Sequence, residues 1–134
     1  MPYVNLKFVK NQITPEQKRA VIKGITDLIV SIMGRDRSLT VITIDELEAS
    51  QWAIGGVCLD ELKKNDVVSF VNLKVSKGTT NPDEINKMMK ATKELMKHEL
   101  GNNEEANYFI IDELNPDAWG FDGISMTVRK MIGK

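Results

Sequence analysis

The sequence predicts an α/β (α+β) fold in which two tandem β-α-β units form a four-stranded sheet with two helices on one face. The first observation is an internal repeat: a shift of 67 residues places Trp119 on Trp52, and the segment 111–114 on the identical segment 44–47. The second is that each copy passes from strand-like alternation to helical spacing and back to a β-rich run. Because each copy is too short to bury a large core alone, we expect the two to share one core.

Alternating side chains indicate the first strand of each unit. Residues 3–9 place Val4, Leu6 and Phe8 on one face and mostly polar side chains on the other. Residues 70–76 repeat the pattern in the second copy. A period of two with one apolar face is typical of a strand that is covered on one side.

A helix with clear start and stop signals follows each first strand. Residues 14–17 read Thr-Pro-Glu-Gln, which predicts a capping box, and residues 81–84 offer a similar start. Gly34 and Gly101 stand where a left-handed residue ends a helix. The stripes at helical spacing are Val21, Ile22, Ile25, Leu28, Ile29, Ile32 and Met33 in the first helix, and Ile85, Met88, Met89, Thr92, Leu95, Met96 and Leu100 in the second.

A second strand is expected after each helix, over residues 40–47 and 108–114. Two strands joined through a helix should lie parallel, with a right-handed crossover. Each unit then has a Trp- and Gly-containing segment, 52–56 and 119–123, which predicts a short hairpin or an edge strand. The predicted organisation is a first unit over residues 1–62, a connector over 63–68 and a second unit over 69–134.

The predicted sheet leaves one face without helices. Packing against other subunits in a closed symmetric oligomer is the natural way to cover such a face. We therefore expect more than one copy of the chain in the functional assembly.

Composition and charge narrow the partners and cofactors. The formal net charge of −1 gives no reason to expect nucleic acid or a membrane surface, and no apolar run approaches the roughly 20 residues of a membrane span. Cys58 is the only cysteine and the N-terminus lacks a leader pattern, which favours a cytoplasmic location. The sequence has no Gly-rich phosphate loop and no Cys/His metal spacing, and its single histidine, His98, falls in the last turn of a predicted helix. We therefore expect neither cofactor nor metal.

Pro2 is the position where the two copies differ most in chemistry, because the second copy has Ser69 there. Methionine aminopeptidase removes Met1 when the second residue is small, which would leave the secondary amine of Pro2 at the N-terminus. Burial or nearby cations would lower the pKa of that amine toward neutral pH. The neutral amine could serve as a general base at carbon, or as a nucleophile toward a carbonyl. Ser69 is internal and offers no such amine.

A proline at the N-terminus of a β-α-β unit is combined here with the helix start at residues 14–18, the strand at 41–47 and the ending Trp-Ala-Ile-Gly-Gly at 52–56. This combination resembles the tautomerase superfamily, and most closely the 4-oxalocrotonate tautomerase family, whose short members end similarly in (Phe/Trp)-Gly-Ile-Gly-Gly. The resemblance covers residues 2–62, and residues 69–125 match more weakly through the repeat. The chain thus resembles a fused, tandem-duplicated member, which implies a tautomerase (MIF-like) fold.

The resemblance implies a cofactor-independent tautomerase or isomerase. Pro2 would be the general base that moves a proton between carbon atoms of an enol to give the ketone, and Trp52 would wall the pocket. Short family members form hexamers, so a fused chain would form a homotrimer with hexamer-like symmetry. Trp119 would support the structure or complete a neighbour's pocket.

The sequence departs from the family at the substrate-binding cations. The two arginines that hold a dicarboxylate are replaced by Gln12 or Ile13 and by Val41, none of which can bind a carboxylate bidentately. The cations nearby in sequence are Lys10, Arg35 and Arg37, and each is a candidate substitute.

We therefore expect a small, weakly charged enol or ketone as substrate. The alternative is a non-catalytic oligomeric homologue that binds a small molecule or serves structure.

Overall fold

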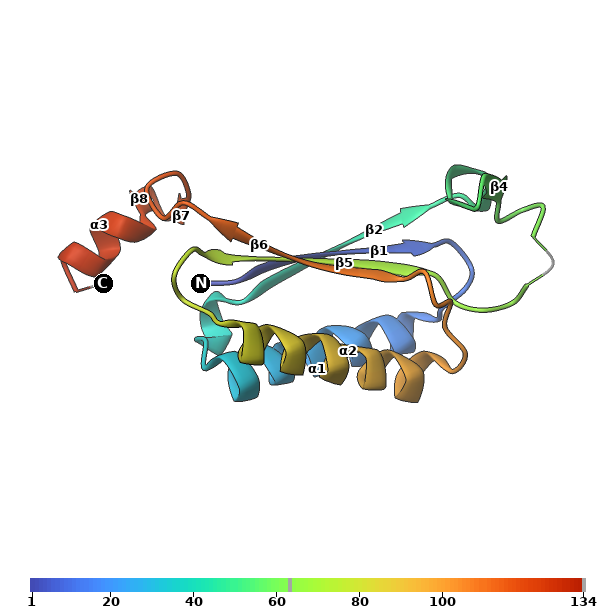
Figure 1. The fold of residues 1–134 in the computed structure, drawn as a ribbon, viewed down its shortest axis with the longest axis horizontal. Helices are drawn as coiled ribbons and strands as arrows, with labels where there is room; N and C mark the ends of the chain where they lie inside the picture. Colours follow the sequence, from blue (N-terminus) through green and yellow to red (C-terminus); the bar gives the residue numbers. More distant parts are fainter. Residues whose placement is uncertain (63, 134) are drawn as a thin grey trace.

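The computed structural model describes residues 1–62 and 64–133, which form a four-stranded sheet covered on one face by two long helices (Figure 1). The sheet has the order β2-β1-β5-β6, and a two-stranded hairpin follows each edge strand. The predicted fold class is confirmed. The elements are β1 (Tyr3–Val9), α1 (Pro15–Met33), η1 (Arg37–Leu39), β2 (Val41–Leu47), η2 (Ala49–Gln51), β3 (Ala53–Ile54), β4 (Val57–Cys58), β5 (Ser69–Ser76), α2 (Pro82–Leu100), β6 (Tyr108–Leu114), β7 (Gly120–Phe121), β8 (Ile124–Ser125) and α3 (Met126–Met131).

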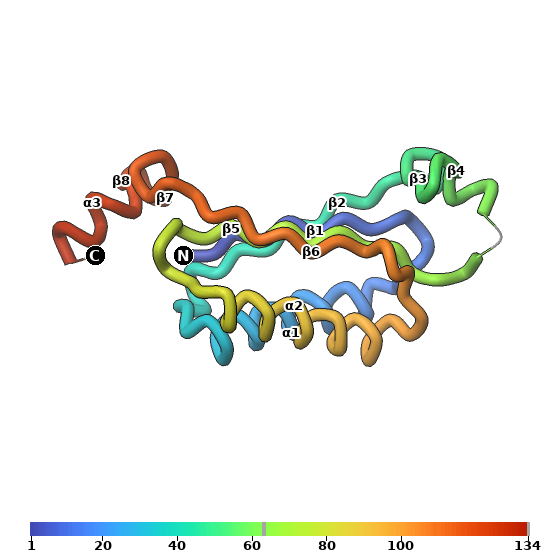
Figure 2. The backbone as a smooth tube through the Cα atoms, in the orientation of Figure 1, coloured from blue at the N-terminus to red at the C-terminus, as the bar shows by residue number. Residues whose placement is uncertain are grey.

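A pseudo-twofold axis at the centre of the sheet relates the two halves of the chain. β1 pairs in parallel with β2, β5 pairs in parallel with β6, and β1 meets β5 antiparallel in the middle. In this central pair Asn5 lies opposite Asn72, which is its own equivalent after the 67-residue shift. The antiparallel pairing places the beginning of β1 beside the end of β5, and the beginning of β5 beside the end of β1 (Figure 2).

The core lies between the sheet and the helices and is built from both halves. On β1 the apolar side predicted from alternation is fully buried, with Val4, Leu6 and Phe8 at 0% exposure. Ile25 of α1 and Met88 of α2 meet this layer at 1% and 0% exposure. Burial of this apolar surface is the main stabilising contribution to the fold.

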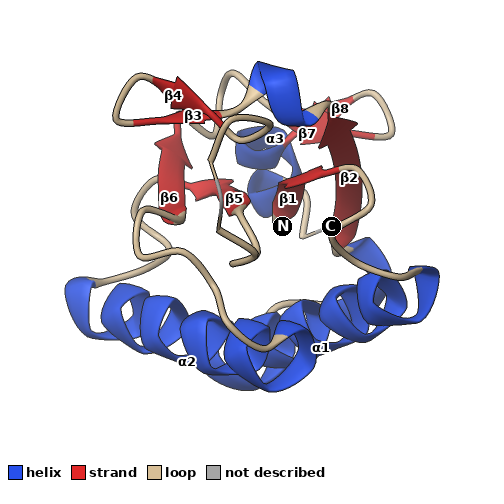
Figure 3. Cartoon of the chain, turned by 90° about the vertical axis from the view of Figure 1, so that its right-hand side faces the viewer, coloured by secondary structure: helices blue, strands red, loops and turns tan. Residues whose placement is uncertain are grey.

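The two long helices lie side by side under the sheet (Figure 3). The predicted capping box is present in α1, where Gln17 N–H donates to Thr14 Oγ1 at 3.1 Å and Thr14 N–H donates to Gln17 Oε1 at 2.8 Å. At the start of α2, Asn81 Oδ1 accepts the N–H of the third helical residue at 2.9 Å. Gly24 of α1 allows close approach of α2, because a Cβ at this position would lie 2.5 Å from Leu95 Cδ1.

The middle of the sheet face away from the helices carries polar side chains. In the first half, Asn5 and Lys7 both donate to Asp45 Oδ2 at 3.2 Å. The second half repeats the arrangement on Asp112, with distances of 2.9 and 2.8 Å. These pairs occupy the middle of the face. The expectation that subunit packing covers the face stays a prediction.

Large apolar side chains are exposed on the same face, where it is formed by the two edge strands. Val41 of β2 is 54% exposed, and Tyr108 and Ile110 of β6 are 67% and 37% exposed. The outer parts of the helix-free face therefore offer apolar surface that another copy of the chain would cover.

The two hairpins agree with the prediction, and three other details differ from it. β2 begins one residue later because Thr40 still ends η1. Gly101 has φ 81° and ψ −128°, so it ends α2 outside the left-handed helical region. No sequence signal predicts α3, because six residues are too few to show a helical period. Ser125 caps α3 by accepting the Val128 N–H at 3.1 Å.

Candidate active site

Pro2 lies buried at the beginning of β1, where the first half meets the end of the second. Its carbonyl accepts the Val41 N–H at 3.4 Å, which extends the pairing of β1 with β2. The next residue, Tyr3, lies opposite Lys74 near the end of β5. Figure 1 accordingly places the N-terminus at the end of the molecule that carries β7, β8 and α3. Both halves therefore contribute to the surroundings of Pro2.

Arg35 is the cation that the fold brings to this end. It follows α1, and its Nη2 donates to the carbonyl oxygen of Thr79 at 2.8 Å and to Thr79 Oγ1 at 3.0 Å. Thr79 belongs to the loop between β5 and α2, so this contact joins the two halves. Burial lowers the pKa of the Met1 α-amine, and the nearby charge of Arg35 lowers it further. The N-terminal segment thus lies where a protonated amine is disfavoured.

Two buried polar atoms at this end have no hydrogen-bond partner in the described part of the chain. One is Nε of Arg35, and the other is Oγ1 of Thr80. A buried donor without a partner is costly, and such groups are frequently satisfied by a ligand or by water. The N–H of Arg35 and the hydroxyl of Thr80 are both suited to binding an oxygen atom.

Trp119 is the tryptophan found at the Pro2 end. Its Nε1 donates to Ser76 Oγ at 2.9 Å, at the end of β5. Ser76 also binds the loop that holds Arg35, because its carbonyl accepts the Thr79 hydroxyl at 2.6 Å. Ser76, Thr79 and Trp119 thus form a polar connection from the second hairpin to Arg35.

Trp52 lies at the opposite end of the sheet. It lines a cavity of about 370 Å³ together with Ser69, Phe70 and Tyr108 of the second half. Because β1 and β5 are antiparallel, the first hairpin reaches the start of the second half rather than its own. Within one chain Trp52 is therefore not beside Pro2, and its role as a wall of the Pro2 pocket stays a prediction.

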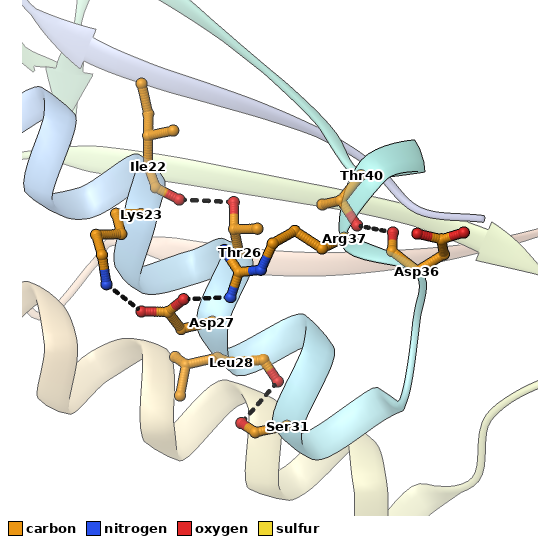
Figure 4. A network of polar contacts seen from close by, with 9 residues as sticks. All are labelled: Ile22, Lys23, Thr26, Asp27, Leu28, Ser31, Asp36, Arg37 and Thr40. Atoms are coloured by element: carbon orange, nitrogen blue, oxygen red, sulfur yellow. Dashed lines mark hydrogen bonds and ion pairs between the residues drawn. The ribbon is translucent and has the colours of Figure 1, made fainter.

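The other two candidate cations do not reach Pro2. Arg37 pairs with Asp27 on the outer surface of α1, where Lys23 also binds the same carboxylate (Figure 4). The hydrogen bonds from Arg37 and Lys23 hold the pKa of Asp27 below its usual range. Lys10 lies at the far end of β1 and pairs with Glu48 at 2.7 Å. The hydrogen bond to Glu48 raises the pKa of Lys10.

Amide side chains bind the backbone at the start of the second half. Asn107 Oδ1 accepts the Ser69 N–H at 3.0 Å, and Gln12 Oε1 accepts the Val68 N–H at 3.0 Å. Gln12 Nε2 also donates to the Asp66 carbonyl at 3.2 Å. Ser69, which is the position equivalent to Pro2, is thus joined to the connector. The side chains around it bind backbone groups.

Sequence reasoning missed Thr79 and Thr80. It considered Gln12 and Ile13 as replacements for a family arginine, but Gln12 binds the connector and Ile13 is a core residue with 6% exposure. The repeat contained a signal, because the 67-residue shift carries positions 12 and 13 onto Thr79 and Thr80. The antiparallel central pair then brings the shifted positions to Pro2.

Across 1–62 and 64–133, no three His, Cys, Asp or Glu side chains are grouped so that they could hold a metal ion. None of the helices in these ranges is both long and apolar enough to cross a bilayer.

The first half of the chain matches a known family along its whole length. The profile of the tautomerase enzymes matches residues 2–61. Probable tautomerase K2 of Dickeya dadantii (strain 3937) is 41% identical over 64 residues, which are 96% of that protein and 48% of this chain. The chain belongs to the tautomerase family. This membership supports a tautomerase or isomerase activity.

The tautomerase also resembles solved structures over nearly its full length. The F6 fused 4-OT wild-type asymmetric trimer matches with a TM-score of 0.81 and 16% identity, over 98% of this chain and 99% of that one. The Q0 fused 4-OT wild-type symmetric trimer matches with a TM-score of 0.80 and 17% identity, over 93% and 96%. At these identities the likeness concerns the fold. With the internal repeat, it shows two tandem units of this fold in one chain, the first of which matches the family profile.

Proposed function

We propose that this tautomerase, after removal of Met1, uses the secondary amine of Pro2 as general base for keto-enol proton transfer on a small carbonyl compound. The observation that carries the proposal is the position of Arg35. This cation is tied to the second half beside the buried N-terminal segment. Burial lowers the pKa of the Met1 amine there, and the charge of Arg35 lowers it further. An amine that is neutral near physiological pH is the form that can accept a proton.

The proposed step uses the groups that lack partners at this end. The amine accepts the proton of the enol hydroxyl, and the electron pair of that O–H bond stays on the oxygen of the resulting enolate. As an oxygen electron pair forms the C=O bond, the electron pair of the C=C bond takes the proton from the ammonium at carbon, so that the base is regenerated. Negative charge develops on the substrate oxygen during the first transfer. We expect the Nε–H of Arg35 and the Thr80 hydroxyl, which lack partners among the described residues, to stabilise this charge.

The proposed assembly is a homotrimer. The exposed apolar side chains of β2 and β6 on the helix-free sheet face support contact between copies, and the two fused 4-OT structures are described as trimers. In such an assembly three Pro2 sites would be present, because Ser69 provides no amine.

Wild-type protein and Pro2→Ala test the proposal directly. Mass spectrometry first establishes that both chains have lost Met1. We expect the wild type to ketonise phenylenolpyruvate, and kcat/KM to fall by about tenfold or more in Pro2→Ala, because alanine keeps an amine but loses the ring that fixes it. Equal rates for the two proteins would contradict the role of Pro2. No ketonisation by either protein would favour the non-catalytic alternative.

The two tryptophans provide a second prediction within the same assay. Trp119→Ala should lower kcat/KM more than Trp52→Ala, because Trp119 lies at the Pro2 end and supports the Ser76 and Thr79 connection. The two substitutions remove similar surface at pseudo-equivalent positions, so each is the control for the other. A larger loss with Trp52→Ala would instead show that a partner copy's hairpin completes the pocket.

A further inference from the structure

A second, larger cavity lies in the second half, at the opposite end of the sheet from Pro2. It has a volume of about 790 Å³ and lies between α2, the start of β6 and the loop 101–107. Val71, Met96 and Phe109 provide apolar walls. This size falls within the range of about 300–1,000 Å³ that is common for small-molecule sites.

Thr92 places a hydroxyl at this cavity that the fold does not require. The residue is 3% exposed and lines the cavity, and its Oγ1 has no hydrogen-bond partner among the described residues. The 67-residue shift places Thr92 on Ile25, which is a core residue at 1% exposure in the first half. The same helical position therefore accepts a purely apolar side chain. An unpaired buried hydroxyl destabilises the folded chain unless a partner is supplied.

Asn103 and Glu104 add acceptor atoms to the same cavity wall. Asn103 Nδ2 donates to the carbonyls of Met96 at 3.2 Å and Gly101 at 2.9 Å, which fixes the orientation of the amide. Its Oδ1 is buried and has no partner in the described chain. The Glu104 side chain is only 10% exposed, and its ion pair is with the exposed Lys64 at 3.7 Å. Both residues line the cavity.

We propose that this cavity binds a small organic molecule with an apolar body and a hydrogen-bond-donating head group, such as an alcohol or an amine. Asn103 Oδ1 and the Glu104 carboxylate can only accept hydrogen bonds, and the Thr92 hydroxyl can accept as well as donate. A ligand that donates O–H or N–H satisfies these atoms, whereas a carboxylate ligand would face Glu104. Lys93 and Lys97 also line the cavity, but both are exposed.

Titration with three ligands of matched size tests the proposal. Benzyl alcohol, benzylamine and benzoate are added to the intact protein, and backbone amide shifts are followed by NMR. We expect benzyl alcohol and benzylamine to shift the amides of Thr92, Asn103 and Glu104, and benzoate to leave them unchanged. Preferential binding of benzoate, or no response to the two donors, would overturn the proposal.

Variants then separate binding from folding. Thr92→Val should weaken the binding of benzyl alcohol by about three- to tenfold, as expected for one lost hydrogen bond, while the ligand-free protein unfolds at the same or a higher temperature. Glu104→Gln should weaken benzylamine more than benzyl alcohol. Thr26→Val is the matched control, because the Thr26 hydroxyl already donates to the Ile22 carbonyl at 2.8 Å on α1. Undiminished binding by Thr92→Val, or an equal loss in Thr26→Val, would refute the site.

Discussion

Retention of Met1 should lower kcat/KM for phenylenolpyruvate ketonisation by about 10²–10⁴-fold, which is the usual contribution of a general base. With Met1 in place, the Pro2 nitrogen is a tertiary amide without basicity, although the fold around it is unchanged. Protein made while methionine aminopeptidase is inhibited provides the retained form. Mass spectrometry gives the fraction of chains that keep Met1, and the rate should scale with the processed fraction.

The same preparation contains its own control. Once Met1 is retained, Pro2→Ala should have no further effect, because neither residue then carries the terminal amine. A retained-Met1 protein that is as active as the processed one would show that another group is the base.

Arg35→Ala should produce the second largest loss, with kcat/KM lowered by about 10²–10³-fold, the range reported for removal of one donor to a developing oxyanion. The pH profile should change as well. A cation beside an amine disfavours the protonated amine and lowers its pKa, so removing Arg35 raises the pKa. Because the neutral amine is the active form, the acidic limb of kcat/KM should move to higher pH.

Two further variants show whether this effect belongs to Arg35 itself. Arg35→Lys keeps the charge, so its acidic limb should stay near that of the wild type while the rate falls. Arg37→Ala removes a cation two residues away that is already paired with Asp27, so rate and profile should change little. Similar losses in Arg35→Ala and Arg37→Ala would point to a general disturbance of this loop. If the acidic limb of kcat/KM does not move in Arg35→Ala, the charge of Arg35 does not influence the pKa of the amine.

Local signals predicted most of the secondary structure. The alternation in β1, the capping box at Thr14 and the proline at the start of each helix act over a few residues, and each appears as expected. The repeat itself predicted that the two halves would share one sheet. The short helix α3 has no comparable signal, since its cap at Ser125 is one serine among several polar residues.

The composition of the Pro2 site depended on contacts between distant parts of the chain. Lys10, Arg35 and Arg37 are equivalent candidates by sequence distance, and only the fold separates them. Because β1 and β5 are antiparallel, each hairpin lies at the start of the other half. Trp119 rather than Trp52 therefore lies at the Pro2 end. No local pattern encodes that pairing. The repeat indicates Thr79 and Thr80 only if it is already known that β1 and β5 are antiparallel, so that each half ends beside the start of the other.

The central β1–β5 pair makes the contact between the two units independent of protein concentration. In a tautomerase made of separate single units, bringing a proline to a second unit's loop is a bimolecular event that weakens as the protein becomes scarce. Here the connector holds both partners in one molecule, and short tethers of this kind give effective concentrations in the millimolar range. The contact of Arg35 with Thr79 is therefore formed at any abundance of the protein in the cell. The two units are also always made in equal numbers, so an unpaired first half never accumulates.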